Sequence, residues 1–152
     1  MRFFRLFVLP LVTTLGCDDP AGPDRDIKVT VSTDLLIVRR SAPTTITVTA
    51  INRGSQSITI NGNDCPARFE ILDVRGEIVG PFQSGLCDAS ARSVTLGPQE
   101  ALTFQYSWNG TGMANAASTL APGAYRIRGH APGLRRRLTS DAIPIAVASS
   151  AP

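Results

Sequence analysis

Three cysteines and one histidine are the residues of this 152-residue chain that could do covalent or acid–base chemistry: Cys17, Cys65, Cys87 and His130. Acid–base catalysis needs a partner that positions the histidine. His130 lies on the polar side of a predicted strand beside two arginines, which favours a solvated residue. The cysteine spacing does not fit a zinc site, and no calcium loop, phosphate loop or nucleophile elbow is present. We therefore expect no enzyme activity, no metal and no cofactor.

The first sixteen residues have the order of an export signal. Two arginines within residues 1–5 precede an apolar run over residues 6–15, and Gly16 then precedes Cys17. The run is too short to span a bilayer comfortably. Residues 14–17 resemble the lipobox of bacterial lipoproteins. The resemblance implies cleavage after Gly16, lipidation of Cys17 and an anchor on the periplasmic or extracellular face of the bacterial cell membrane. Plain secretion and an uncleaved anchor are the alternatives.

The two other cysteines are predicted to pair. If Cys17 carries lipid, Cys65 and Cys87 remain in an exported, oxidising compartment, where unpaired thiols are unusual. A disulfide between them would close a loop of about 22 residues and contribute about 3 kcal/mol in the chain-entropy model. Two reduced thiols are the alternative. Residues 17–26, the lipidated cysteine and a polar stretch with two prolines, are predicted to form a flexible tether.

The charge of the chain does not favour nucleic acid as a partner. There are 15 basic and 12 acidic residues. Removal of residues 1–16 takes away two arginines and leaves 13 against 12, or +1, which is no basic stripe. The most pronounced run of like charges consists of Arg135, Arg136 and Arg137. This run is either a solvated loop or a contact for anionic lipid headgroups or cell-wall polymers.

Short segments of alternating or β-branched residues, separated by turn residues, fill the rest of the chain. They lie at residues 27–33, 35–38, 44–51, 57–60, 67–74, 78–79, 93–96, 102–109, 125–130 and 143–147. This spacing predicts an all-β fold: a single immunoglobulin-like antiparallel β-sandwich of about seven to eight strands over residues 27–148, with a tail at 149–152. A closed barrel fits less well. The segment at 57–60 is predicted to form a hairpin with the one at 44–51.

Residues 95–131 are predicted to form an aromatic hairpin, two strands joined by a long polar loop, that supplies much of the core. Phe104, Tyr106 and Trp108 share one face of the first strand. A ligand platform is the alternative for Trp108. Tyr125 begins the second strand after a Pro-Gly turn, so we expect its hydroxyl to bind the preceding corner, as in the tyrosine corner of Greek-key sandwiches.

A set of motifs within residues 44–130 carries a family resemblance. The motifs are TVTAINRG at 47–54 followed by ITI at 58–60, FEILDVRGEIV at 69–79, LGPQE at 96–100, FQYSWNG at 104–110 and LAPGAY at 120–125. Together they resemble the BsuPI-type intracellular proteinase inhibitor family. The resemblance implies an immunoglobulin-like sandwich and inhibition of a proteinase through an exposed loop. The best candidate for that loop is the segment 80–91, which contains Phe82 and Cys87.

Two functions follow as hypotheses. The first is a membrane-tethered bacterial envelope lipoprotein whose immunoglobulin-like domain contacts an envelope protein or polymer through its loops, because loops on a rigid scaffold commonly carry recognition. The second is a proteinase inhibitor of the BsuPI type. Recognition is expected in the loop at 109–121 or in the cysteine-bounded segment before it.

Overall fold

The computed structural model describes residues 23–40, 42–60, 68–81, 93–113, 118–131 and 138–149. These residues contain one short 3-10 helix, η1 (Pro23–Asp26), and eleven β-strands. None of the described helices is long and apolar enough to cross a membrane. Several predicted features lie outside the described residues: the signal segment, Cys17, Cys65, Phe82, Cys87 and residues 135–137.

The strands form two main sheets and one small one. The three-stranded sheet has the order β1 (Ile27–Thr33), β3 (Thr44–Asn52), β8 (Ala101–Trp108). The larger sheet has the order β2 (Ile37–Val38), β11 (Ile143–Val147), β9 (Gly123–Ala131), β5 (Arg68–Leu72), β6 (Ile78–Gly80), and β10 (Leu138–Thr139) also pairs with β9. The small sheet pairs β4 (Ile58–Ile60) with β7 (Val94–Leu96).

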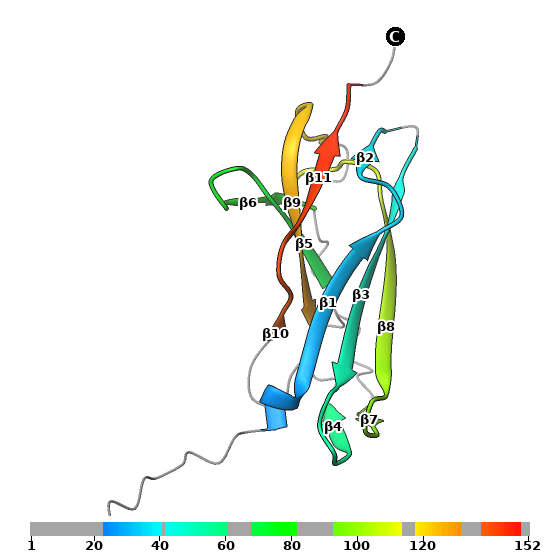
Figure 1. Cartoon of the computed structure of the whole chain (residues 1–152). Helices are drawn as coiled ribbons and strands as arrows, with labels where there is room; N and C mark the ends of the chain where they lie inside the picture. The colour runs from blue at the N-terminus through cyan, green and yellow to red at the C-terminus, as the bar shows by residue number, and fades with distance from the viewer. Residues whose placement is uncertain are drawn as a thin grey trace, which may run out of the picture.

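The two main sheets pack face to face as a β-sandwich (Figure 1). In one layer the order β1-β3-β8 matches strands A, B and E of the immunoglobulin fold, and in the other β11-β9-β5 matches G, F and C. The fold is therefore all-β with an immunoglobulin-like strand order. Eleven strands lie in the described residues, more than the predicted seven to eight. β2 falls within the predicted segment 35–38, whereas β10, a pairing of only two residues, is too short to show alternation.

The core lies between the sheets. Along β3 every second residue is buried, and Ile46 and Val48 are fully covered. Phe69 of β5 crosses from the other sheet, with its ring centroid 5.6 Å from that of Tyr106 and 6.4 Å from that of Trp108. Full burial of each such apolar side chain contributes about 1.5–3 kcal/mol, so these contacts are the main force joining the layers.

The predicted aromatic hairpin is wrong. Strand β8 pairs with β3, whereas β9 pairs with β5 and β11 in the other sheet. The described parts of the link between them, residues 109–113 and 118–122, lie at one end of the sandwich (Figure 1). Alternation along each strand gives the buried face but not the neighbouring strand, which is why both strands were placed correctly and their pairing was not.

The predicted hairpin between residues 44–51 and 57–60 is also wrong, because β4 pairs with β7. The cause lies at Asn52, which is fully buried at the end of β3. Its Nδ2 donates to the carbonyl oxygens of Gln56, Leu96 and Gly97 at 2.7, 3.0 and 3.1 Å. These bonds satisfy a buried amide and direct the chain away from β3 toward β7.

Candidate functional site

The residues predicted to be modified or to bind lie mostly outside the described part of the chain. Lipidation of Cys17, the pairing of Cys65 with Cys87 and the binding role of Phe82 stay predictions. So does the binding role of Arg135, Arg136 and Arg137.

The four aromatic residues predicted for the core are all described. Trp108 is buried, and its Nε1 donates to the carbonyl oxygen of Thr111 at 3.1 Å. Phe104, Tyr106 and Tyr125 are partly buried and pack against the core. Burial raises the pKa of the Tyr106 phenol. The hydroxyl of Tyr125 donates to the carbonyl oxygen of Ala121 at 2.8 Å, so the predicted bond back to the corner is present.

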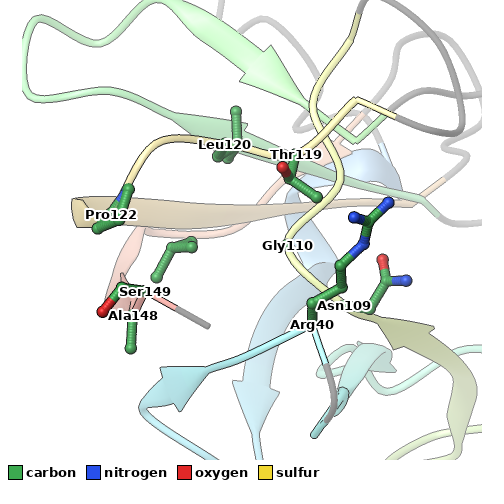
Figure 2. A pocket seen from close by; sticks show the side chains of 9 residues that line it. Arg40, Asn109, Gly110, Thr119, Leu120, Pro122, Ala148 and Ser149 are labelled. Atoms are coloured by element: carbon green, nitrogen blue, oxygen red, sulfur yellow. The ribbon is translucent and has the colours of Figure 1, made fainter. Parts of the chain in front are cut away.

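One end of the sandwich contains a pocket of about 190 Å³. The link between β8 and β9, the end of β11 and the turn after β2 form its walls. Figure 2 shows Arg40 and Asn109 at one end of the pocket and Pro122, Ala148 and Ser149 at the other. Thr119, Leu120 and Val147 also line it.

The wall that the β8–β9 link supplies is held by backbone hydrogen bonds. Gly110 has a φ of +84°, a conformation that glycine adopts without steric cost. Its carbonyl oxygen accepts from the amide of Leu120 at 2.8 Å, and the amide of Gly112 donates to Ser118 at 3.0 Å. The amide of Met113 donates to the carbonyl oxygen of Val79 in β6 at 3.0 Å. The pocket is therefore preformed on its link side.

The chemistry of the pocket suits binding. Its described lining has one guanidinium, one amide and hydroxyl groups beside the apolar surfaces of Leu120, Pro122 and Val147. A guanidinium, an amide and hydroxyls can orient a small polar or anionic group by hydrogen bonds. The described lining has neither a carboxylate nor a histidine, the side chains that most often act as acids and bases.

A second polar cluster lies on the outer face of the larger sheet, where Glu70 of β5 is opposite Arg128 of β9. Nη2 of Arg128 donates to Oε2 of Glu70 at 2.8 Å, and Nε2 of His130 lies 2.8 Å from the same oxygen. The Glu70 side chain is 14% exposed and the His130 side chain 7%. Two nitrogen groups thus converge on one nearly buried carboxylate oxygen.

The prediction that His130 is solvated is wrong, because the residue is buried. Strand β9 is central in its sheet: β5 covers one side of it and β10 the other, with Thr139 directly opposite His130. The sequence correctly places His130 on the polar face, but the polar face of a central strand need not be exposed to solvent. The residue that could have indicated this burial is Glu70, whose carboxylate lies on the face of the segment 67–74 opposite to Phe69 and Ile71.

Opposing effects set the pKa of Glu70. Burial raises it, whereas the hydrogen bond and charge of Arg128 and the nearby His130 lower it, and the net pKa lies below its ordinary value. The carboxylate is therefore ionised and engaged by its two neighbours, which suits a structural ion pair better than a proton donor. The described residues contain no group of three or more acidic, cysteine or histidine side chains that could hold a metal ion.

No protein-family model matches this sequence, and no curated protein matches it. Among solved structures, the chain is similar to the CARDB domain of the PF1109 protein from Pyrococcus furiosus, solved with di-metal ions, at 16% identity and a TM-score of 0.48 over 82% of this chain and 94% of that one.

Parts of two larger proteins are also similar. The β-glucosidase EmGH1 from Erythrobacter marinus matches at 13% identity and a TM-score of 0.46 over 80% of this chain and 15% of that one. The DNA glycosylase AlkC from Pseudomonas fluorescens matches at 7% identity and 0.47 over 81% and 30%. Likenesses at this level carry no argument about activity. They also show no family by sequence.

Proposed function

We propose that this protein is a non-catalytic envelope lipoprotein, tethered through lipid on Cys17, whose immunoglobulin-like domain binds a polar group of an envelope protein or polymer in the pocket at the end of the sandwich. The observation that carries the proposal is this pocket, whose link side is preformed and whose described lining has groups for hydrogen bonding and no carboxylate or histidine.

The position of the pocket supports this use. Helix η1 and the start of β1 lie at one end of the sandwich, and the β8–β9 link and the end of β11 lie at the other (Figure 1). A tether that enters through η1 therefore attaches at the end away from the pocket and does not obstruct it. Loops gathered at one end of a rigid sandwich are a common place for recognition.

A pocket-filling variant tests the binding role. Thr119 is exposed at the pocket, so Thr119→Arg should place a long side chain in it. Thr95→Arg is the matched control, because Thr95 is an exposed threonine on β7 outside the pocket lining. Full-length wild type and the Thr95 variant should recover the same envelope component by affinity capture, and the Thr119 variant should lose it. Equal recovery by all three proteins would exclude the pocket as the binding site.

The lipid anchor has its own test. In cells fed labelled palmitate, the wild-type protein should carry label and Cys17→Ala should carry none, because the thiol is the acceptor. Label that persists in Cys17→Ala would refute the anchor and leave the pocket proposal standing.

A proteinase inhibitor of the BsuPI type is the second candidate. An inhibitor needs an exposed residue on a base that is already ordered, because preorganisation lowers the cost of binding. Met113 is 53% exposed and its amide is fixed by the bond to Val79, which favours this use.

A proteinase panel decides on the inhibitor. Micromolar full-length protein should inhibit at least one proteinase, and Met113→Asp should abolish the inhibition. Val74→Asp should not, because Val74, although 81% exposed, lies in the β5–β6 turn away from this link. The absence of inhibition by wild type across the panel would rule this candidate out.

A further inference from the structure

Strand β8 forms an open edge of the three-stranded sheet. One side of it pairs with β3 over eight residues, from Ala101 opposite Ile51 to Trp108 opposite Thr44. On its other side the described residues place no strand (Figure 1). An open edge presents unpaired amide and carbonyl groups and can pair with another chain.

The other sheet edges have features that discourage such pairing. β2 has two residues, and β6 has three, with a register shift where it meets β5 at Ile71 and Leu72. β1 carries the exposed charge of Lys28. Short length, irregular register and an edge lysine are the means by which natural sheets avoid edge-to-edge association.

β8 has none of these features. Its sequence, ALTFQYSW, contains no charge, no proline and no glycine, and its register with β3 is regular throughout. On the outer face Thr103, Gln105 and Ser107 are exposed and neutral. On the inner face Phe104 and Tyr106, which the sequence predicts as core, are only partly buried. The edge is therefore long, neutral and incompletely covered.

We propose that β8 is a self-association edge, which pairs antiparallel with β8 of a second copy of this chain about a two-fold axis. The pairing would join the two three-stranded sheets into one sheet of six strands. It is isologous, so each copy contributes the same residues and the assembly closes as a dimer.

A second copy fits this edge because the alternation of β8 is self-complementary. In a two-fold antiparallel pair centred on Gln105, Phe104 lies opposite Tyr106 of the other copy and Thr103 lies opposite Ser107. Aromatic residues then meet aromatic residues on the inner face and neutral polar residues meet on the outer face, and both kinds of cross-strand pair are stabilising. No like charges are brought together.

The dimer does not depend on the proposed pocket or on the anchor, and it is compatible with both. Antiparallel pairing puts the two η1 helices at opposite ends of the shared sheet. A strand of eight residues spans about 26 Å. Residues 18–22, which precede η1, can extend to about 17 Å, and the four residues of η1 add about 8 Å. Two anchored chains could thus reach one membrane with the sheet lying along it.

Light scattering of the detergent-solubilised full chain measures the association. Wild type should be a dimer at micromolar concentration, and Gln105→Lys should raise the dimer dissociation constant at least about fivefold, because two lysines would meet at the axis. Thr47→Lys is the matched control: Thr47 is the partner of Gln105 on the central strand β3 and shares its outer face, so this variant should stay dimeric. Unfolding transitions check that all three proteins are folded.

Cross-linking locates the contact. With a short bis-maleimide, Gln105→Cys should give a covalent dimer in excess of wild type, and Thr47→Cys should not. A wild-type monomer, a Gln105→Lys dimer of unchanged affinity, or equal cross-linking at both positions would overturn the proposal.

Discussion

The two outer faces of the sandwich differ in what their polar residues do. Apart from Lys28, the outer face of β1-β3-β8 carries cross-strand rows of neutral side chains, such as Thr30, Thr49 and Thr103. On that face the Thr49 and Thr103 hydroxyls lie 3.3 Å apart, exposed to solvent. The outer face of β5 and β9 carries Glu70 with Arg128 and His130, and there the carboxylate is almost enclosed.

The same sequence pattern therefore contributes differently to the stability of the fold on the two faces. Both faces arise from polar residues at every second position of a strand. Exposed cross-strand pairs contribute only a few tenths of a kcal/mol up to about 1 kcal/mol, because water replaces them when they are lost. A nearly buried charge cannot be compensated in that way, so the loss of its partner is costly. The neutral face should tolerate substitution, and the charged face should not.

The largest effect is expected from removal of the shared carboxylate. Glu70→Ala leaves the Arg128 guanidinium and the buried His130 without it, and the free energy of unfolding should fall by about 2–3 kcal/mol, less than for a fully buried pair because Arg128 is 35% exposed. Glu77→Ala, an exposed carboxylate in the adjacent turn, should change it by no more than about 0.5 kcal/mol. Urea unfolding measures both. Equal effects would remove the distinction between the two faces.

The next effect concerns the inner side of the same strand. Gly129 precedes His130 but faces the other sheet, and a Cβ added to it would lie 3.1 Å from Cβ of Val31 and 3.2 Å from Cγ1 of Val48. Neither valine can move without shifting its strand, so Gly129→Ala should cost about 1–3 kcal/mol through overpacking. Thermal unfolding measures it, with Gly123→Ala as the control, because Gly123 is exposed at the start of β9. Full tolerance at Gly129 would mean that the sheets are loosely joined.

Acid should weaken the charged face selectively. The folded-state pKa of Glu70 lies below its ordinary value of 4.5, so the ionised carboxylate stabilises the fold above that pH. This stabilisation is lost as the pH falls below 4.5 through the folded-state pKa. Denaturant unfolding from neutral to acid pH should therefore show a steeper loss of stability in wild type than in Glu70→Gln. Parallel pH profiles would contradict the assignment of Glu70 as a stabilising anion.

Local patterns in the sequence predict part of this molecule, whereas long-range contacts determine the rest. The strand at 44–51, the buried faces of β3 and the bond from Tyr125 to its corner follow from local patterns. The partners of β8 and β9 do not follow from local patterns, because alternation does not indicate which strand lies beside which.

Long-range partners limit the prediction of the candidate sites in the same way. The burial of His130 depends on β10 and on Glu70, 60 positions earlier, so its polar neighbours in the sequence gave the wrong environment. The pocket combines Arg40, Asn109 and Val147 from three distant segments, and only the link at 109–121 was expected to take part in recognition.

The smallest effect should occur on the neutral face. Thr49→Ala removes the hydroxyl contact with Thr103 and a β-branched residue from the central strand, and because both hydroxyls are exposed, the free energy of unfolding should fall by no more than about 1 kcal/mol. Thr49→Val keeps the branched shape without the hydroxyl and should be closer to wild type. Urea unfolding of the two variants separates the contribution of shape from that of the hydroxyl contact. If Thr49→Val lost as much stability as Glu70→Ala, the hydroxyl rows would be energetically equivalent to the buried ion pair, and exposure would not be what distinguishes the two faces.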